Sequence, residues 1–311
     1  MTTKCISLVR GRVARFTRLD NCGRPIYGDD STVTTKGFIS VAYSANTDDG
    51  DDINVTNAAG DRCVYEPAVS SLLGYNVEVQ FCNVDPDLFA LATGQAVVTD
   101  AFGNVVGFKV NSDVKSSDSQ FALEVWSGAP TDTAACLDPN AQGTYGYILL
   151  PYVQGGIIGD FTIENDAVTF TITGASTKDG NAWGVGPYDI MLGLTGATTL
   201  PEALDPNDHM TVILTNVAPP TPACGARPLL DPSGAAITGV TPTPDGTDGL
   251  IVSFAPTPAG ADPWWMDFGD GTWDYSADGS AIEHTFEAAG TYTYVAYRGT
   301  SEFEGTVTVT E

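Results

Sequence analysis

Residues 144–189 read TYGYILLPYVQGGIIGDFTIENDAVTFTITGASTKDGNAWGVGPYD, and this stretch decides the predicted fold. Residues 145–152 are almost continuously apolar, as in a strand buried on both faces. Residues 161–173 alternate between apolar and polar types, which predicts a strand with one buried face, broken by a turn at 164–167. The predicted inward side chains are Phe161, Ile163, Val168, Phe170 and Ile172, and the outward ones are Thr162, Glu164, Thr169, Thr171 and Thr173. Glycines between 174 and 186 then predict a structured loop that carries Trp183 and Tyr188.

The rest of the first 217 residues predicts more strands and one helix. Residues 75–81 (YNVEVQF) alternate most clearly, with Asn76, Glu78 and Gln80 on the polar face. A helix is predicted next, because Asp85 suits the N-cap, Pro86 the first turn and Gly94 the C-terminal stop. Further strands are predicted within residues 5–19, 38–44, 53–57, 104–110, 120–126 and 209–216, and the polar segment 111–119 is expected to be mobile.

Composition favours a mainly-β protein of two domains. The 311 residues include 34 Gly and 19 Pro with abundant β-branched and aromatic types. The formal charge of −26 argues against nucleic-acid binding by phosphate neutralisation, although solubility alone would also explain such acidity. We predict domains at 1–217 and 229–311, joined by the Pro-rich linker 218–228. The second domain has short strands near 250–254, 264–268, 292–298 and 303–310, a pattern typical of an immunoglobulin-like sandwich.

Basic residues gather at the N-terminal end. Seven of the thirteen lie in the first 36 positions, namely Lys4, Arg10, Arg12, Arg15, Arg18, Arg24 and Lys36. A contact between this segment and an acidic neighbouring copy is one interpretation, with Arg12, Arg15 and Arg18 as the predicted inter-subunit residues. The alternative is that these arginines are solvated side chains on an edge strand.

Several other classes of site find little support in the sequence. No apolar run has the length of a membrane span, and the N-terminal segment lacks the pattern of a secretory signal, so we expect synthesis in the cytosol.

The six cysteines have no metal-ligand spacing and are expected to be free and largely buried thiols, although the even number leaves a disulfide as an alternative. The acidic run 48–52 is expected to be an exposed loop; it lacks the ligand spacing of an EF-hand calcium site. We predict no catalytic, cofactor-binding or metal-binding residue.

Two segments of the second domain resemble a known family. WMDFGDGT (265–272) followed by HTFEAAGTYT (284–293) resembles a PKD-type immunoglobulin-like domain. Gly269 and Gly271 predict a tight turn around Asp270. The aromatic residues Trp265, Phe286 and Tyr292 are expected to fill the sandwich, and His284 is expected to be a turn or packing histidine.

Six segments of the first domain carry a second resemblance: RFTRLDNCG (15–23), VEVQFCNVDPDLFALATG (77–94), FALEVW (121–126), YGYILLP (145–151), GDFTIE (159–164) and GNAWGVGPY (180–188). Taken together in this order, they are similar to major tail proteins of long-tailed bacteriophages that infect actinobacteria. The resemblance implies a tail-tube-type β-sandwich or barrel with a flanking helix. It also implies hexameric rings, stacked into a tube that DNA crosses, with the tape measure, tail terminator and distal tail proteins as partners.

A DNA conduit should present few cations, because each phosphate contact adds binding that slows transit. The residues predicted to face the lumen are therefore the polar sets Asn76, Glu78, Gln80 and Thr169, Thr171, Thr173; the alternative is that they meet solvent or the helix. The second domain would decorate the tube exterior, either as a spacer or with a weak contact to host-surface glycans.

Two other functions fit the sequence less well. A secreted hydrolase has few candidates for a catalytic triad, since the chain has only two histidines. A secreted or cell-surface adhesin built from two immunoglobulin-like modules explains the composition but not the first-domain resemblance, and it stands as the alternative function.

Overall fold

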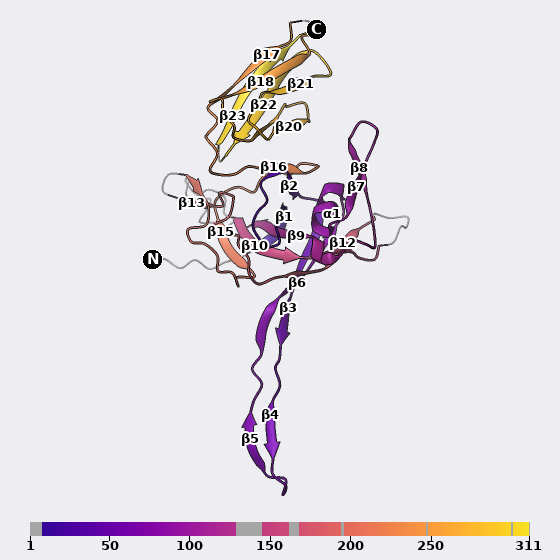
Figure 1. Cartoon of the computed structure of the whole chain (residues 1–311), viewed down its shortest axis with the longest axis vertical. Coiled ribbons are helices and arrows are strands. Elements are labelled where there is room, and N and C mark those ends of the chain that lie inside the picture. Colours follow the sequence, from indigo (N-terminus) through magenta and orange to yellow (C-terminus); the bar gives the residue numbers. More distant parts are fainter. Residues whose placement is uncertain are drawn as a thin grey trace. The chain divides into compact units, whose positions relative to one another are not determined.

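The computed structural model describes residues 8–128, 145–161, 168–193, 196–246, 248–299 and 301–310. The chain is mainly β, with 52% strand, 4% helix and several antiparallel sheets, which confirms the predicted class. It divides into two compact units (Figure 1). The first comprises Met1–Pro25 and Val33–Gly225, and the second comprises Ile26–Thr32 and Ala226–Glu311. The division after Gly225 falls inside the predicted linker.

A large antiparallel sheet contains most strands of the first unit, and residues 28–32 and 227–229 of the second unit also belong to it. Its order is β16-β2-β1-β9-β10-β12-β6-β3, with β11 added to β12 and β15 to β10. The strands are β1 (Val9–Arg18), β2 (Gly28–Thr35), β3 (Phe38–Asp48), β6 (Ser71–Phe81), β9 (Gln120–Gly128), β10 (Tyr145–Gln154), β11 (Ile157–Ile158), β12 (Phe170–Thr177), β15 (Thr211–Thr215) and β16 (Arg227–Leu229). Every residue of β9 is buried, and β10 is buried or half-buried throughout, as its continuous apolar run predicts.

Alternation along β9 gives this sheet two different cores. On one side, Phe121 packs against Phe16, with ring centroids 5.5 Å apart. On the other side, Trp126 packs edge-on against Tyr147 at 5.1 Å, together with buried Trp183 from the predicted glycine-rich loop. The sheet is therefore covered on both faces along β9.

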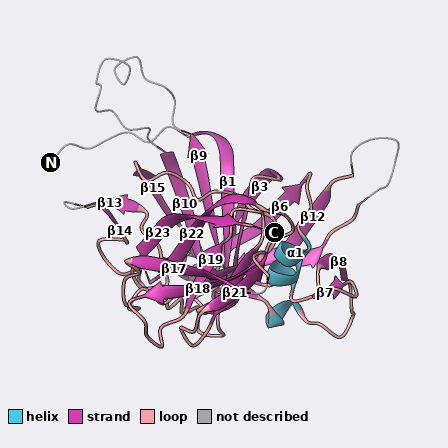
Figure 2. Ribbon diagram, turned by 90° about the horizontal axis from the view of Figure 1, so that it is seen from above, coloured by secondary structure: helices cyan, strands magenta, loops and turns pink. Residues whose placement is uncertain are grey.

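Helix α1 (Pro86–Thr93) confirms the predicted helix and its two ends (Figure 2). The Asp85 carboxylate accepts a hydrogen bond from the backbone N–H of Asp87 at 3.0 Å. Gly94 adopts the left-handed conformation that ends the helix, with φ of 70°. The buried ring of Phe89 packs against Phe81 of β6 at 5.7 Å, so the helix is fixed to the first of the two cores.

Three small hairpins add to the first unit. They are β4 (Ile53–Thr56) with β5 (Arg62–Glu66), β7 (Ala96–Thr99) with β8 (Val105–Lys109), and β13 (Met191–Leu192) with β14 (Ala197–Thr198). Figure 1 shows that β4 and β5 continue beyond β3 and β6, away from the large sheet. The segment expected to be mobile contains the short 3₁₀ helix η1 (Ser116–Asp118).

The second unit is a sandwich of two antiparallel sheets, β17-β18-β21 and β20-β19-β22-β23. The strands are β17 (Gly239–Pro244), β18 (Ile251–Thr257), β19 (Trp264–Asp267), β20 (Trp273–Ser276), β21 (Ile282–Thr285), β22 (Gly290–Arg298) and β23 (Ser301–Val309). Their buried side chains form one core that includes Phe254, Phe268 and Phe286.

The predicted core role of Trp265 is wrong. Trp264 is fully buried, and its indole N–H donates to the Ser280 carbonyl at 2.8 Å. Trp265 is only half-buried and stacks on Tyr297 at 4.3 Å. Successive strand residues point to opposite faces, so Trp264, Met266 and Phe268 share the inner face and Trp265 lies outside. Phe286 is buried as predicted, and half-buried Tyr292 stacks on it at 4.4 Å.

Two other predictions need correction. The described cysteines Cys22, Cys63, Cys82 and Cys224 are free, as predicted, but exposed, because they lie in turns or on the edge of the fold. Phe161, predicted to face inward, is about half exposed and precedes β12 instead of lying in it. Lys4, Cys5 and Cys136, together with the predicted turn and its neighbours at 162–167, lie outside the described residues. No helix in the described part of the chain is long and apolar enough to span a membrane.

Candidate assembly surfaces

Strands β3, β6 and β12 place most of the predicted lumen residues side by side. Gln80 of β6 lies opposite Thr171 of β12 and opposite Ser40 of β3. Its side-chain amide donates to the hydroxyl of Thr169 at 3.4 Å. The register thus gathers, into one polar face, residues that lie about ninety positions apart in the sequence.

This polar face consists of Ser40, Ala42, Ser44, Asn76, Glu78, Gln80, Thr169, Thr171 and Thr173. It includes one carboxylate, Glu78, and no lysine or arginine. Asn76 and Glu78 are exposed, whereas Gln80 and the three threonines are half-buried. The opposite face of β6 is buried through Val77, Val79 and Phe81, so the predicted alternation of this strand is confirmed.

Arg15 occupies a place that the sequence analysis did not predict. It is 8% exposed, and its Nε and Nη2 each donate to a Glu124 carboxylate oxygen at 2.6 Å. The guanidinium also lies 3.2 Å from the ring centroid of Tyr188. Arg15 therefore belongs to the core of its own chain, and we withdraw it from the set of inter-subunit residues. The polar residue Glu124 inside the apolar segment FALEVW is the sequence signal that could have predicted this pair.

Burial and neighbouring charges shift the pKa values of Arg15 and of Tyr147, which also contacts Glu124. Burial by itself lowers the pKa of Arg15, but the charges of Glu124 and Tyr188 and the hydrogen bonds to Glu124 together outweigh burial and raise that pKa above its usual value. Tyr147 donates its hydroxyl to Glu124 at 2.7 Å. Burial, and then the Glu124 charge, raise the pKa of Tyr147 well above its usual value, so the phenol stays protonated.

The other two predicted arginines are more accessible. Arg12 is exposed, with its guanidinium 5.9 Å from the ring centroid of Tyr145. Arg18 is half-buried at the end of β1. Neither forms an ion pair with a described residue of this chain.

The hairpin that continues from β3 and β6 is exposed along its whole length. We call residues 44–73 the arm, and every one of them is exposed. Ile53, Val55 and Val64 lie on one face of its β4–β5 ladder, and each is about half exposed. The ladder is interrupted at 49–52 and 67–70, where the Asp52 carboxylate accepts the Ala68 N–H at 2.6 Å and Asp49 accepts the Ser70 hydroxyl at 3.1 Å. Carboxylates thus hold together the neck of the arm.

A hydroxyl, an imidazole and a carboxylate meet at the base of the arm. Thr177 Oγ1 lies 3.0 Å from His209 Nδ1, and His209 Nε2 lies 3.1 Å from Asp179 Oδ1. This order resembles a hydrolase triad. However, the Thr177 side chain is buried, and its oxygen accepts the backbone N–H of Tyr75 at 2.8 Å. Thr177 therefore anchors β6 to β12 at Tyr75, and His209 and Asp179 extend this chain of polar contacts.

In the second unit, His284 is the packing histidine that the sequence predicts. Its ring stacks on Phe268 at 3.9 Å, and its Nε2 lies 2.7 Å from an Asp270 oxygen. Burial raises the pKa of Asp270, but hydrogen bonds from Thr272 and His284 outweigh that effect and lower it. This contact fixes the turn around Asp270.

Comparison with models of known protein families and with curated proteins finds no match for this chain. Within the described residues, no group of three or more His, Cys, Asp or Glu side chains could hold a metal ion. The polar face and the arm are the candidate surfaces for function.

Proposed function

We propose that this chain is a structural virion protein, a subunit of the tail tube of a long-tailed bacteriophage. Copies of it assemble into stacked, hexameric rings around a channel for DNA. The observation that carries the proposal is the arm. A two-stranded hairpin alone in water is marginally stable, and clustered exposed apolar side chains mark interaction sites. Ile53, Val55 and Val64 are each about half exposed in their own chain, and assembly would cover the exposed half.

The polar face of β3, β6 and β12 is the surface that we assign to the channel. A cation on this wall would bind phosphate and slow the passage of DNA. Serine, threonine and amide side chains offer only weak, neutral contacts, and Glu78 repels phosphate. DNA therefore passes without specific binding.

We assign the second unit to the exterior of the tube as a decoration. There it would also make a weak contact with host-surface glycans. Its residues 228–311 contain thirteen acidic residues and one basic residue, a composition that keeps particles soluble and separate. The partners at the tube ends would be the tape measure, tail terminator and distal tail proteins. The protein would be made in the host cytoplasm and reside in the virion tail.

Negative-stain electron microscopy of the purified full-length chain over a concentration series tests the proposal. We expect rings and then tubes with a central channel. In a matched variant, an Asn-Gly turn replaces residues 49–70 and closes the hairpin after the last β3–β6 pair, Asp48 with Ser71. We expect this variant to keep the circular dichroism and thermal unfolding of the parent but to form no tubes.

Two outcomes would contradict the proposal. A monodisperse monomer at every concentration would favour the adhesin. Equal assembly by the armless variant would remove the observation on which the proposal rests.

A further inference from the structure

The start of β1 is distorted at two neighbouring arginines. Val9 pairs with Gly128, Gly11 with Ser127 and Val13 with Trp126, so Arg10 and Arg12 are the extra residues of two consecutive bulges. A bulge leaves its extra residue outside the ladder and redirects its side chain. Arg10 also has a φ of 47°, which is rare for a bulky residue and recurs at functional positions.

These bulges create a surface that is both basic and apolar. Arg10 and Arg12 are exposed, and neither pairs with a carboxylate among the described residues. Leu8, two positions before Arg10, is 36% exposed, and half-buried Tyr145 lies beneath the Arg12 guanidinium. We call Leu8, Arg10, Arg12 and Tyr145 the basic patch.

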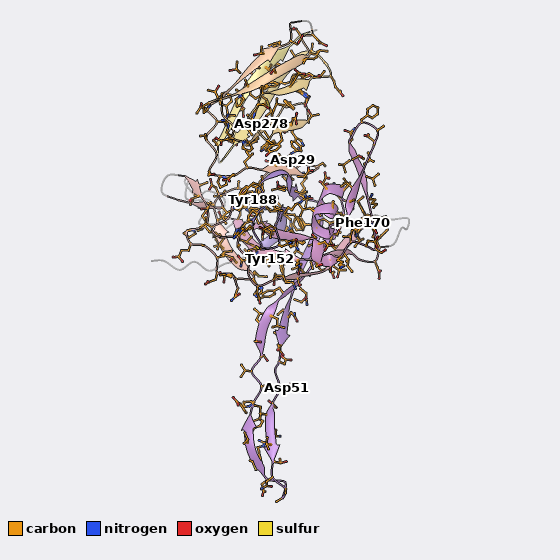
Figure 3. All side chains as sticks on the ribbon, in the orientation of Figure 1. Asp29, Asp51, Tyr152, Phe170, Tyr188 and Asp278 are labelled. Atoms are coloured by element: carbon orange, nitrogen blue, oxygen red, sulfur yellow. The ribbon has the colours of Figure 1, made fainter. Side chains whose placement is uncertain are left out.

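The arm has the complementary chemistry. It contains six acidic residues (Asp48, Asp49, Asp51, Asp52, Asp61 and Glu66) and one basic residue, Arg62. Arg62 lies over the ring of Tyr65 at 4.4 Å, and no described carboxylate of the arm is in an ion pair. Figure 3 shows Asp51 on the arm, apart from the body of the first unit. The arm therefore offers uncompensated negative charge beside an uncovered apolar face.

We propose that the arm of one copy docks on the basic patch of a second copy. Because a chain of charge −26 repels its copies in general, contact depends on a local match of opposite charges, and the two bulged arginines supply one. The apolar face of the arm covers Leu8 and Tyr145. This inference rests on the proposed function for its assembly, and it identifies the partner surface of the arm.

The geometry of such a contact also determines what it builds. The arm and the basic patch are different surfaces, so the contact is heterologous, and in a docked pair one copy retains a free patch and the other a free arm. A heterologous contact that does not close on itself extends an assembly without limit. In stacked rings, the arm of a copy in one ring would dock on the basic patch of a copy in the next ring.

Charge reversal tests the pairing. We expect Arg10→Glu with Arg12→Glu to reduce tube yield at least about tenfold, because like charges then face each other across the contact. Asp51→Lys with Glu66→Lys, at two exposed positions whose side chains have no hydrogen bond or ion pair among the described residues, should have the same effect. The chain that carries all four substitutions should recover assembly. Arg24→Glu with Lys178→Glu is the matched control, at exposed basic residues outside the patch.

Cross-linking detects the contact between the arm and the basic patch whether or not tubes form. Arg12→Lys retains the charge and provides an amine that a carbodiimide joins to a carboxylate. In a mixture of ¹⁵N-labelled and unlabelled copies of this variant, mass spectrometry should find peptides that contain the substituted position joined to arm peptides of the other isotope. Arg24→Lys should yield no such product.

The outcomes separate the two proposals. Tubes that tolerate both reversals, or the absence of a cross-link between copies, would overturn the docking inference and leave the tube proposal standing. A cross-link between copies in particles that lack a channel would support docking and contradict the tube.

Discussion

At the scale of single residues, identical side chains acquire different roles from their partners. Arg12 and Arg15 lie on the same strand, but Arg15 meets Glu124 in the core and Arg12 meets solvent. A buried ion pair is tolerated when its hydrogen bonds are complete, and removal of one partner typically costs about 3–5 kcal/mol. The Arg15–Glu124 pair joins β1 to β9 at one register position, so we infer that it specifies that register.

Tyr147 gives this cluster a measurable pH dependence. Its folded-state pKa is raised by burial and by Glu124, so the folded protein retains a proton that the unfolded chain releases near pH 10. The resulting stabilisation is complete below that pH and is lost as the pH rises toward the folded-state pKa.

We therefore expect the free energy of unfolding to fall above about pH 10, by up to ~1.4 kcal/mol per pH unit from this group. In Tyr147→Phe this fall should be smaller, although the variant also loses a hydrogen bond and should be less stable at neutral pH. Urea unfolding from pH 8 to 11 measures both slopes, and identical slopes would show that Tyr147 ionises normally in the folded state.

At the scale of elements, β6 joins two environments within one strand. Ser71, Leu72 and Leu73 are exposed in the arm, whereas Val77 and Val79 are buried in the sheet. Gly74 lies at the transition with a φ of +138°. A Cβ at Gly74 would lie 2.7 Å from Thr177 Oγ1, so the close approach of β6 to Thr177 requires glycine.

This close approach predicts a local loss of stability. Gly74→Ala should destabilise the chain by about 1–3 kcal/mol, because it combines backbone strain with a collision at Thr177. Gly60→Ala is the matched control, since Gly60 also has a positive φ, +89°, but no atom lies within 4 Å of a Cβ built there. Chemical denaturation compares the two variants. Equal losses would show that strain alone, and not the contact with Thr177, makes Gly74 necessary.

At the scale of the whole molecule, the two units differ in the work that we assign to them. The proposed channel face, arm and basic patch all belong to the first unit. The second unit is a sandwich with its own core, and its exposed surface is strongly acidic. A unit with its own core can fold independently. None of the surfaces that we propose for assembly belongs to the second unit.

Deletion of residues 231–311 tests this division of roles and retains β16, which ends at Leu229. We expect the shortened chain to form tubes of unchanged channel diameter and reduced outer diameter in electron micrographs. Loss of assembly on this deletion would show that the second unit is structural, and would contradict its assignment as decoration.

Local patterns in the sequence determined much of this protein. They predicted the mainly-β class, helix α1 with both of its ends, the buried run in β10 and the polar face of β6. Each depends on residues within a few positions of one another, because caps, turns and strand alternation are short-range effects.

Only the tertiary structure decided the burial of Arg15, the isolation of the arm, the choice of Trp264 over Trp265 for the core, and the meeting of Gln80 with Thr171. Arg15 and Glu124 lie 109 positions apart, and no local pattern records which distant strand will lie alongside. The arm also shows that a local pattern does not determine what a strand packs against. Its alternating apolar residues have the pattern of a buried strand, but all of them are exposed in the described chain, because burial depends on what a strand packs against.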